Sequence, residues 1–486
     1  MYFDYTLDPN TFFIDDRTWT DLNMDEVYSK IDRTLTSCGQ HVLYDILRKP
    51  LFEKDELKKR GTLISHFQTN NKIRESLQLI LSKGDTVDGG NAVYLLWEEL
   101  NPIRSGLLYY ILFIFALLSP GLFLISIPLG MSGIAMAFFM NMKIHYSVQK
   151  AIQGHFPSVK YIGRLVRCAL DILKLDDELL KEYQETLEKN IKPVSNLPQK
   201  TGYVGSKNLD EFYQYLSIFY LIEVRTFWRV MGIIRRYEKE LRIIYRELGT
   251  LDAILSIASY RESLPSYCEP EFRSPLKVKD IYHPLLDKPV SNSISLKKTG
   301  VLITGSNMSG KSTFLRTIGI NVLFAQSIYT CLASSYQGGF YELLTSIGRS
   351  DNIIEGKSYY LVEAQALLRI IQNIERGVYT FCIVDEIFRG TNSTERLAAS
   401  HHVLRYLARK NCLTFVATHD LELIDLLGDL YENYHFRESF SESGLEFDYL
   451  LKEGPSATKN AIRLLEFLGY PEEVIKPAEI EVKGKA

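Results

Sequence analysis

Cysteine is scarce in this sequence of 486 residues: there are six, and no two of them form a C-x-x-C pair. Widely spaced cysteines fit neither a disulfide framework nor a zinc site, so the sequence indicates a reducing compartment. A strong net charge is also missing, because 56 Lys and Arg residues stand against 59 Asp and Glu residues. A protein that coats itself in nucleic acid is normally basic, so any contact with DNA must be local.

No signal peptide, internal repeat or low-complexity tract is evident. The first residues, MYFDYTLDPN, are acidic and polar, which is not the pattern of a signal peptide. Hydrophobic residues make up 46% and charged residues 24%, which are ordinary values for a globular protein and exclude disorder and a polytopic membrane protein. At roughly 150 residues per domain, the length predicts about three domains.

One long stretch lacks charge altogether. Residues 105–142 contain no Asp, Glu, Lys or Arg. A buried helical pair would normally carry a polar stripe, whereas roughly 18 uncharged apolar residues suffice for a membrane span. We therefore expect a transmembrane helical hairpin with its turn at 119–121 or 128–130, although one half could be re-entrant. Arg104 and Lys143 flank the stretch, which predicts that both ends face the cytoplasm.

The pattern of apolar and polar residues changes after this segment. Residues 143–272 indicate a helical lever region, with apolar residues at three- and four-residue spacing most regular over 209–260. From residue 273 onward, short β-rich runs alternate with helical patterns. This alternation predicts an α/β domain over 273–486 with a mainly parallel sheet.

A glycine-rich motif follows the apolar run 301–304. The sequence GSNMSGKST matches G-x-x-x-x-G-K-[ST] and precedes a helical pattern. Such glycines let backbone N–H groups turn toward phosphates, and the helix N-terminus adds a positive dipole end. We expect Lys311 to reach the β- and γ-phosphates of ATP and Ser312 to bind Mg²⁺. The predicted phosphate-binding residues are Gly305, Ser306, Asn307, Met308, Ser309, Gly310, Lys311, Ser312 and Thr313.

Two further apolar runs end in polar side chains. Asp385 and Glu386 follow the run FCIV, and His419 follows the run TFVAT. An Asp-Glu pair at a strand end often simply enters solvent, but its position downstream of a phosphate-binding motif favours chemistry. We expect Asp385 to lie near the metal, Glu386 to polarise an attacking water, and His419 to sense the γ-phosphate and orient that water.

Together these motifs resemble the ATPase of the MutS family. The sequence DEIFRGT and the later NST, with GSNMSGKST upstream and THD downstream, carry the resemblance. It implies a P-loop NTPase domain of the ABC type that uses ATP and Mg²⁺ and pairs with a second copy, as a homodimer. The segment TSIGRSD, followed by GKSYYLVE, is similar to the signature loop of the family. By position Ser358 would then reach the nucleotide of the partner, which is compatible with a plain helix-capping role. His283 and Asn292 resemble residues beside the nucleotide.

The resemblance extends to the first part of the chain. WTDLN at 19–23, LRKPL at 47–51 and LDAILS at 251–256 are similar to the core and lever of the family, so residues 1–104 are expected to be a mostly helical, core- or lever-like region. The mismatch-reading domain of the family would precede Trp19, where this sequence has 18 residues, and its DNA clamp would lie between the lever helices, where this sequence has the uncharged stretch. Both domains are therefore expected to be absent. Near the C-terminus, the family sequence Ser-Tyr-Gly reads Lys-Asn-Ala at 459–461.

These observations predict an ATP hydrolase of the MutS type, by family a DNA-binding, mismatch-repair-type protein. Its ATPase domain would be cytoplasmic, dimeric and anchored in the membrane. One alternative is a membrane-anchored ATPase that drives a conformational change in a protein partner or transport machine without binding DNA. Another is a scaffold that binds ATP but turns over little, against which the presence of Glu386 argues.

Overall fold

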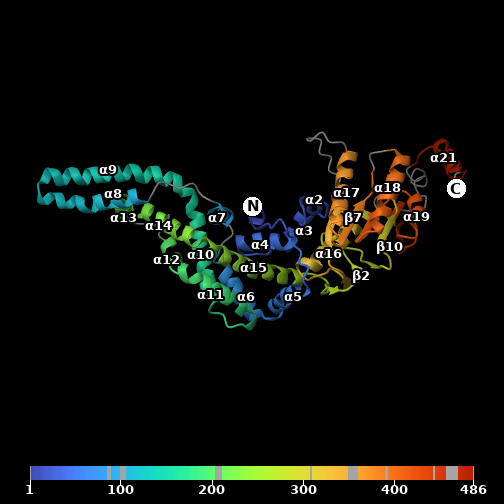
Figure 1. Ribbon diagram of the computed structural model, residues 1–486, viewed down its shortest axis with the longest axis horizontal. Helices are drawn as coiled ribbons and strands as arrows, with labels where there is room; N and C mark the ends of the chain where they lie inside the picture. The colour runs from blue at the N-terminus through green and yellow to red at the C-terminus, as the bar shows by residue number, and fades with distance from the viewer. Residues whose placement is uncertain are drawn as a thin grey trace. The chain divides into compact units, whose positions relative to one another are not determined.

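A computed structural model shows a chain that divides into two compact units (Figure 1). It describes residues 2–84, 89–98, 106–202, 211–306, 309–347, 359–388, 392–441, 444–455 and 469–484. The helical unit consists of Met1–Asp8, Asp32–Asp45 and Leu63–Glu262, and the α/β unit consists of Pro9–Ile31, Ile46–Thr62 and Ser263–Ala486. The backbone therefore passes between the units five times, and the linear ranges expected from the sequence do not follow this division.

The described elements of the helical unit are all helices. They are α1 (Tyr2–Thr6), α6 (Asn71–Leu81), α7 (Gly89–Trp97), α8 (Leu107–Leu118), η1 (Ser119–Leu124), α9 (Ile127–Ile152), η2 (Gln153–His155), α10 (Phe156–Ile172), η3 (Glu178–Leu180), α11 (Lys181–Ile191), η4 (Lys192–Val194), α12 (Leu197–Gly202), α13 (Glu211–Phe219), α14 (Ile222–Arg236) and α15 (Glu238–Glu262). Two helices, α4 (Ser37–Arg48) and α5 (Lys54–Thr69), begin in one unit and end in the other. The expectation of a mostly helical region is confirmed.

Helices α8 and α9 run side by side as a hairpin (Figure 1). Both predicted turn positions are wrong: residues 119–121 lie in η1, which continues α8 and packs against the start of α9, and the chain turns at Ile125 and Ser126 instead. Pro128 lies in the first turn of α9. Proline is tolerated there because the first helical N–H groups have no partner within the helix. Helix α9 continues past Lys143 to Ile152, so the end of the uncharged stretch is not the end of a helix. A single charged side chain does not break helical hydrogen bonding.

The amphipathic stretch 209–260 is not one helix. Within its described part, α13, α14 and α15 are separated at Leu221, which has a left-handed backbone with a φ of 50°, and at Tyr237. Leu221 is fully buried against Tyr109, Leu112 and Val224, and this packing holds the break. Neither position carries a glycine or a proline, so the usual sequence signal for a helix break is missing.

The α/β unit contains two sheets. Its elements are α2 (Asp16–Asp21), α3 (Met24–Ile31), β1 (Glu271–Phe272), β2 (Lys277–Ile281), β3 (Asn292–Ser295), β4 (Gly300–Thr304), α16 (Lys311–Ser327), β5 (Ser335–Gly338), β6 (Glu342–Ser346), α17 (Tyr359–Glu375), β7 (Thr380–Asp385), α18 (Ser393–Ala408), β8 (Cys412–Ala417), α19 (Glu422–Leu427), β9 (Glu432–Ser441), β10 (Gly444–Glu453) and α21 (Glu472–Gly484). The larger sheet has the order β10-β9-β4-β8-β7-β6, and the smaller has the order β1-β5-β2-β3.

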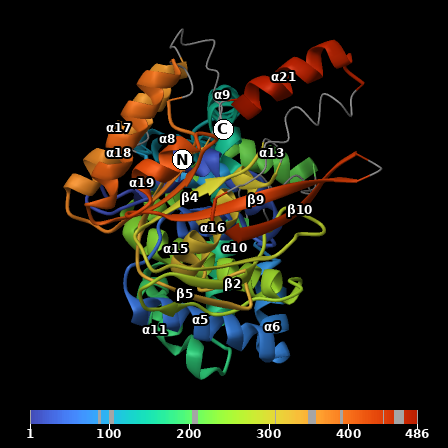
Figure 2. The ribbon, with the colours of Figure 1, turned by 90° about the vertical axis from the view of Figure 1, so that its right-hand side faces the viewer.

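The larger sheet is mainly parallel and is covered on both faces. Strands β9, β4, β8, β7 and β6 run parallel, and β10 is an antiparallel edge. Alternate residues of β7 face opposite ways: Cys382 and Val384 pack in the cluster with α17, α18 and α19, which lie together in Figure 2. Ile383 faces α16, where a Cβ at Gly319 would lie 2.8 Å from its Cδ1. Both faces of a parallel sheet are normally buried in this way.

Candidate active site

Three neighbouring parallel strands end at the same edge of the larger sheet. Ile303 and Asp385 both pair with Ala417, so β4, β7 and β8 end level with one another. The pairing continues one step further, because Glu386 N–H donates to the Ala417 carbonyl at 2.9 Å. The glycine-rich loop, the Asp-Glu pair and the residues after β8 therefore meet, as the sequence predicts.

Two glycines of the loop have backbone conformations that other residues rarely adopt. Gly305 has a φ of 141° and Gly310 a φ of 105°. A Cβ at Gly305 would lie 2.8 Å from the carbonyl oxygen of Phe436, so a side chain there would both strain the backbone and clash. Asn307 and Met308 lie outside the described residues. The first turn of α16 follows at once, so its free N–H groups end the loop.

Lys311 and Ser312 stand at the start of α16. The Lys311 ammonium donates to the carbonyl oxygens of Gly305 at 2.8 Å and Ser306 at 2.7 Å, so it is bent over its own loop. The Ser312 hydroxyl donates directly to the Asp385 carboxylate. The hydroxyl of Ser309 is buried and has no hydrogen-bond partner among the described residues. The site thus collects a cation, two hard oxygen ligands and an orphaned hydroxyl.

Glu386 and His419 form the other side of the site. Glu386 has a left-handed φ of 61°, and its Oε1 lies 2.9 Å from Nε2 of His419. The same nitrogen lies 3.4 Å from the Lys311 ammonium. Carboxylate, imidazole and ammonium therefore converge at the edge of the sheet where the sequence places Glu386, His419 and Lys311.

The position of His419 is fixed by residues that the sequence analysis did not single out. Arg396 of α18 donates to both oxygens of Asp420, at 2.9 and 2.7 Å. The backbone N–H of Asp420 also donates to the Thr418 hydroxyl at 3.0 Å. Because bidentate Arg–carboxylate pairs fix geometry as well as charge, this pair orients the loop that presents His419. The THD sequence hinted at the aspartate, but nothing local pointed to Arg396.

His283 and Asn292 both line the same cavity, which has a volume of about 850 Å³. His283 is 7% exposed, and its pKa is lowered to about 4 by burial and by the positive charges of Arg316 and Lys30. The amide of Asn292 donates to the Tyr449 carbonyl at 3.1 Å and accepts from Leu451 N–H at 2.6 Å. Asn292 therefore shapes the wall at the irregular part of β10.

Other cavity residues were missed because they are far apart in the sequence. Arg316, Lys288, Phe436, Tyr449 and Ile347 line the cavity together with Lys311, Ser312, Thr313, Asp385 and Glu386. Tyr449 has a left-handed φ of 53°. Ser358, residues 459–461 and Arg104 lie outside the described residues.

The residues present fit a nucleotide-bound Mg²⁺ better than a free-standing metal site. Within the described ranges no group of three or more His, Cys, Asp or Glu side chains could hold a metal ion. Ser312 and Asp385 offer one hydroxyl and one carboxylate in direct contact. Mg²⁺ is commonly bound by one or two such protein oxygens together with phosphates and water.

Residues 301–484 match MutS domain V, an ATPase domain. The DNA mismatch repair protein MutS of Thermus aquaticus is 25% identical over 95% of this chain and 61% of its own length. Residues 301–484, which contain most of the site, belong to the MutS domain V family. The DNA mismatch repair protein MutS of Thermus thermophilus is 27% identical over 64% of this chain and 39% of its own length. The human MutS protein homolog 4 is 29% identical over 52% of this chain and 29% of its own length.

The chain spans less than two thirds of the length of these MutS relatives. What their names state, DNA mismatch repair, is a property of those proteins. Proteins of the MutS family generally use ATP with Mg²⁺, function as dimers and bind DNA.

Proposed function

We propose that this protein hydrolyses ATP with Mg²⁺ in a P-loop domain of the ABC type. One observation carries the proposal: His419 Nε2 lies 2.9 Å from Glu386 and 3.4 Å from Lys311. This group lies beside the Ser312–Asp385 contact, at the ends of neighbouring parallel strands. Ligands in open α/β sheets bind at the carboxyl ends of the strands.

Each residue has a task that follows from its contacts. Lys311 would exchange two loop carbonyls for phosphate oxygens, and the loop N–H groups would bind the same phosphates. Ser312 and Asp385 would hold Mg²⁺, which supplies charge neutralisation at the phosphates. Glu386 would accept a proton from the attacking water, and His419 would orient that water.

The test is Mg²⁺-dependent phosphate release from ATP by the full chain, compared with Glu386→Gln. The amide keeps the shape of the side chain but cannot accept the proton, so this variant should bind ATP and accumulate it unhydrolysed. Glu422→Gln makes the same chemical change at an exposed position of α19 and should behave as wild type. Hydrolysis by Glu386→Gln at the wild-type rate would refute the assignment of the base.

A dimer with composite nucleotide sites is part of the same proposal. The support is similarity to a family whose proteins function as dimers. Ser358 would be the residue that crosses to the partner, by the motif GKSYYLVE.

We also propose that the α8–α9 hairpin anchors the chain in a membrane. Among the described residues, Leu107–Leu124 and Ile127–Lys150 are long and apolar enough to span one, and only 22% of an apolar 18-residue window in each is buried. At about 1.5 Å per residue, spans of 18 and 24 residues reach roughly 27 and 36 Å, close to a hydrocarbon core of about 30 Å. Core helices of a soluble protein pass the length test too, but they are mostly buried. The ATPase would then face the cytoplasm.

We propose that the protein binds DNA and that ATP drives a conformational change while it is bound. Similarity over 95% of the chain to a protein named for DNA mismatch repair supports DNA over a partner-driving machine that does not bind it. Binding of solubilised protein to duplex and branched DNA, with and without ATP and across salt, tests this. No binding under any of these conditions would favour the machine without DNA.

A further inference from the structure

Helix α2 belongs to the α/β unit although it lies near the start of the chain. It begins after Asp15, whose carboxylate accepts from Thr18 N–H at 2.7 Å and caps the helix. The segment Pro9–Ile31 that contains α2 is joined to the helical unit at both of its ends.

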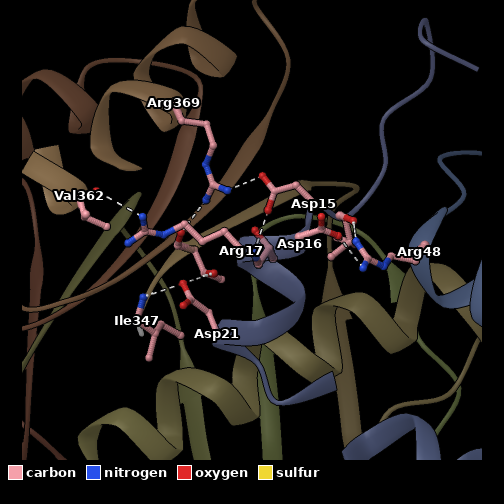
Figure 3. Close-up of polar contacts among 11 residues, drawn as sticks. Asp15, Asp16, Arg17, Asp21, Arg48, Ile347, Val362 and Arg369 are labelled. Atoms are coloured by element: carbon pink, nitrogen blue, oxygen red, sulfur yellow. Dashed lines mark hydrogen bonds and ion pairs between the residues drawn. The ribbon is translucent and has the colours of Figure 1, made fainter. Parts of the chain in front are cut away.

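The carboxylate of Asp21, the last residue of α2, is buried and fully engaged. Asp21 is 5% exposed, and its Oδ2 accepts from the Thr345 hydroxyl at 2.7 Å and from Ile347 N–H at 2.8 Å (Figure 3). Thr345 lies in β6, which ends at Ser346. The carboxylate therefore fixes the end of the outermost parallel strand.

The backbone of Asp21 contacts a second wall of the nucleotide cavity. Its carbonyl oxygen accepts from Nε of Arg316 at 2.8 Å. Arg316 lies in the second turn of α16, the helix that starts at Lys311. Both Arg316 and Ile347 line the cavity. One residue of α2 thus holds two cavity-lining residues that come from different elements.

Two arginines fasten the rest of α2 to α17. Arg369 pairs with Asp15 and donates to the Thr345 carbonyl at 2.6 Å (Figure 3). Arg17 donates to the Val362 carbonyl at 3.2 Å. Because these contacts include partly buried charged groups, α2 cannot shift without breaking charge-assisted hydrogen bonds.

We propose that Asp21 is a positioning residue of the nucleotide site. Through Asp21, binding of a nucleotide at this site also affects α2 and the rest of the segment Pro9–Ile31. The inference rests on the proposed ATPase function. Asp21 touches no nucleotide: it acts by placing Ile347 and Arg316. Bound ATP changes the surroundings of these two residues, and their hydrogen bonds to Asp21 carry the change to α2.

The kinetic test compares Asp21→Ala, Asp21→Asn and a control in the same segment. Asp21→Ala removes the acceptor of the Thr345 hydroxyl and of Ile347 N–H. It should lower kcat and raise KM for ATP by roughly tenfold each, because small displacements in an active site are costly. Asp21→Asn places its amide oxygen where Oδ2 accepts and should stay within roughly threefold of wild type. Asp25→Ala removes the acceptor of the Trp19 indole at 2.8 Å and should leave kcat and KM unchanged.

Thr345→Val keeps the proposal testable if Asp21→Ala does not fold. It deletes one of the two donors at the same oxygen and should shift the kinetics in the same direction by less. Melting temperatures separate a structural effect: Asp25→Ala should lower the melting temperature without a kinetic change. Kinetics of Asp21→Ala equal to those of Asp25→Ala would overturn the positioning role. So would an Asp21→Asn variant as impaired as Asp21→Ala.

Hydrogen exchange tests the transmission. Addition of a non-hydrolysable ATP analogue to the full chain should slow amide exchange in residues 9–31, and Asp21→Ala should lose this effect while still binding the analogue. An identical response in Asp21→Ala would overturn the transmission. A wild-type chain that binds but does not hydrolyse ATP would instead refute the proposed function, while the exchange experiment would still decide the coupling.

Discussion

Glu386 reaches His419 from a strained backbone: its φ is 61°, and 2.9 Å separates its Oε1 from the His419 Nε2. Phe388, two residues later, has a φ of 58°. Such conformations cost about 1–3 kcal/mol each and persist where the surroundings hold them. Here Ile387 and Phe388 are buried in the cluster beneath α17 and α18, so the buried pair anchors the turn that points Glu386 into the site.

Replacing Lys311 with alanine should weaken ATP binding. The ammonium group sits over the loop at 2.8 and 2.7 Å from two carbonyl oxygens, in the position that phosphates would share. A hydrogen bond to a charged group contributes about 1.5–3 kcal/mol, so the affinity should fall by roughly 10- to 150-fold. Titration with a fluorescent ATP analogue measures this. Lys277→Ala, at an exposed position of β2, is the control, and unchanged affinity in Lys311→Ala would contradict the phosphate role.

Acidification should destabilise the fold through His283. Its pKa is about 4 in the folded chain, below the usual 6.5, because it is buried near Arg316 and Lys30. Between pH 6.5 and 4 the unfolded chain takes up a proton that the folded chain does not, so stability is present above pH 6.5 and lost as the pH falls toward 4. A shift of this size corresponds to about 3 kcal/mol.

Urea unfolding at a series of pH values measures this loss, and His283→Gln should flatten it. The comparison has to be a difference between the two proteins, because Asp252 acts in the opposite direction. Burial raises the pKa of Asp252 to about 6, so the folded chain gains a proton first and is stabilised as the pH falls. Identical pH slopes for wild type and His283→Gln would show that His283 is not buried as a neutral group.

Charges placed halfway along the hairpin should release the protein from membranes. Ile114 and Met136 are exposed apolar residues in α8 and α9, and each lies 11 positions from Ile125 in the turn. An aspartate in a bilayer centre costs about 2.5–3.5 kcal/mol, so Ile114→Asp with Met136→Asp should move the chain to the soluble fraction. Alkaline carbonate extraction measures the partition, and Leu79→Asp, an exposed apolar position on α6, is the control. Full extraction of wild type would contradict insertion.

Composite sites predict complementation between two inactive subunits. Ser358→Arg should spare ATP binding by its own subunit but block hydrolysis in the partner's site, because a bulky cation would displace the opposing phosphates. Mixed with Lys311→Ala subunits, it should restore one working site per dimer. ATPase activity measured over mixing ratios tests this, and no recovery at any ratio would argue against paired sites.

The residues at the strand ends could be found from the sequence because their positions depend only on parallel pairing. Gly305, Asp385 and His419 each follow a short apolar run, and parallel strands place such ends at one edge. The mainly parallel sheet followed from the same alternation of runs. The family resemblance added His283 and Asn292, which do line the cavity, but not the bonds of Asn292 to β10.

What the sequence could not reveal depends on contacts between distant segments. Asp21 contacts Thr345 and Ile347, which lie more than 300 positions away in the sequence. Local periodicity cannot predict contacts between residues so far apart. The break at Leu221 has the same origin, since packing against Tyr109 and Leu112 fixes it. The hairpin turn was mispredicted for a different reason: Pro120 and Pro128 both stand in the first turn of a helix, where proline does not break the helix.

The alternation of the chain between its two units has a consequence for biosynthesis. The helical unit is complete once Glu262 has been made, whereas the α/β unit needs residues from Pro9–Ile31, Ile46–Thr62 and everything after Ser263. At about 5–20 residues per second, the first of these segments waits roughly 20–90 s until the last residues of its unit have been made. Ile14, Trp19 and Leu22, all buried in the finished protein, face water meanwhile. Nascent chains of this protein should therefore depend on chaperones that shield the N-terminal segment until translation ends.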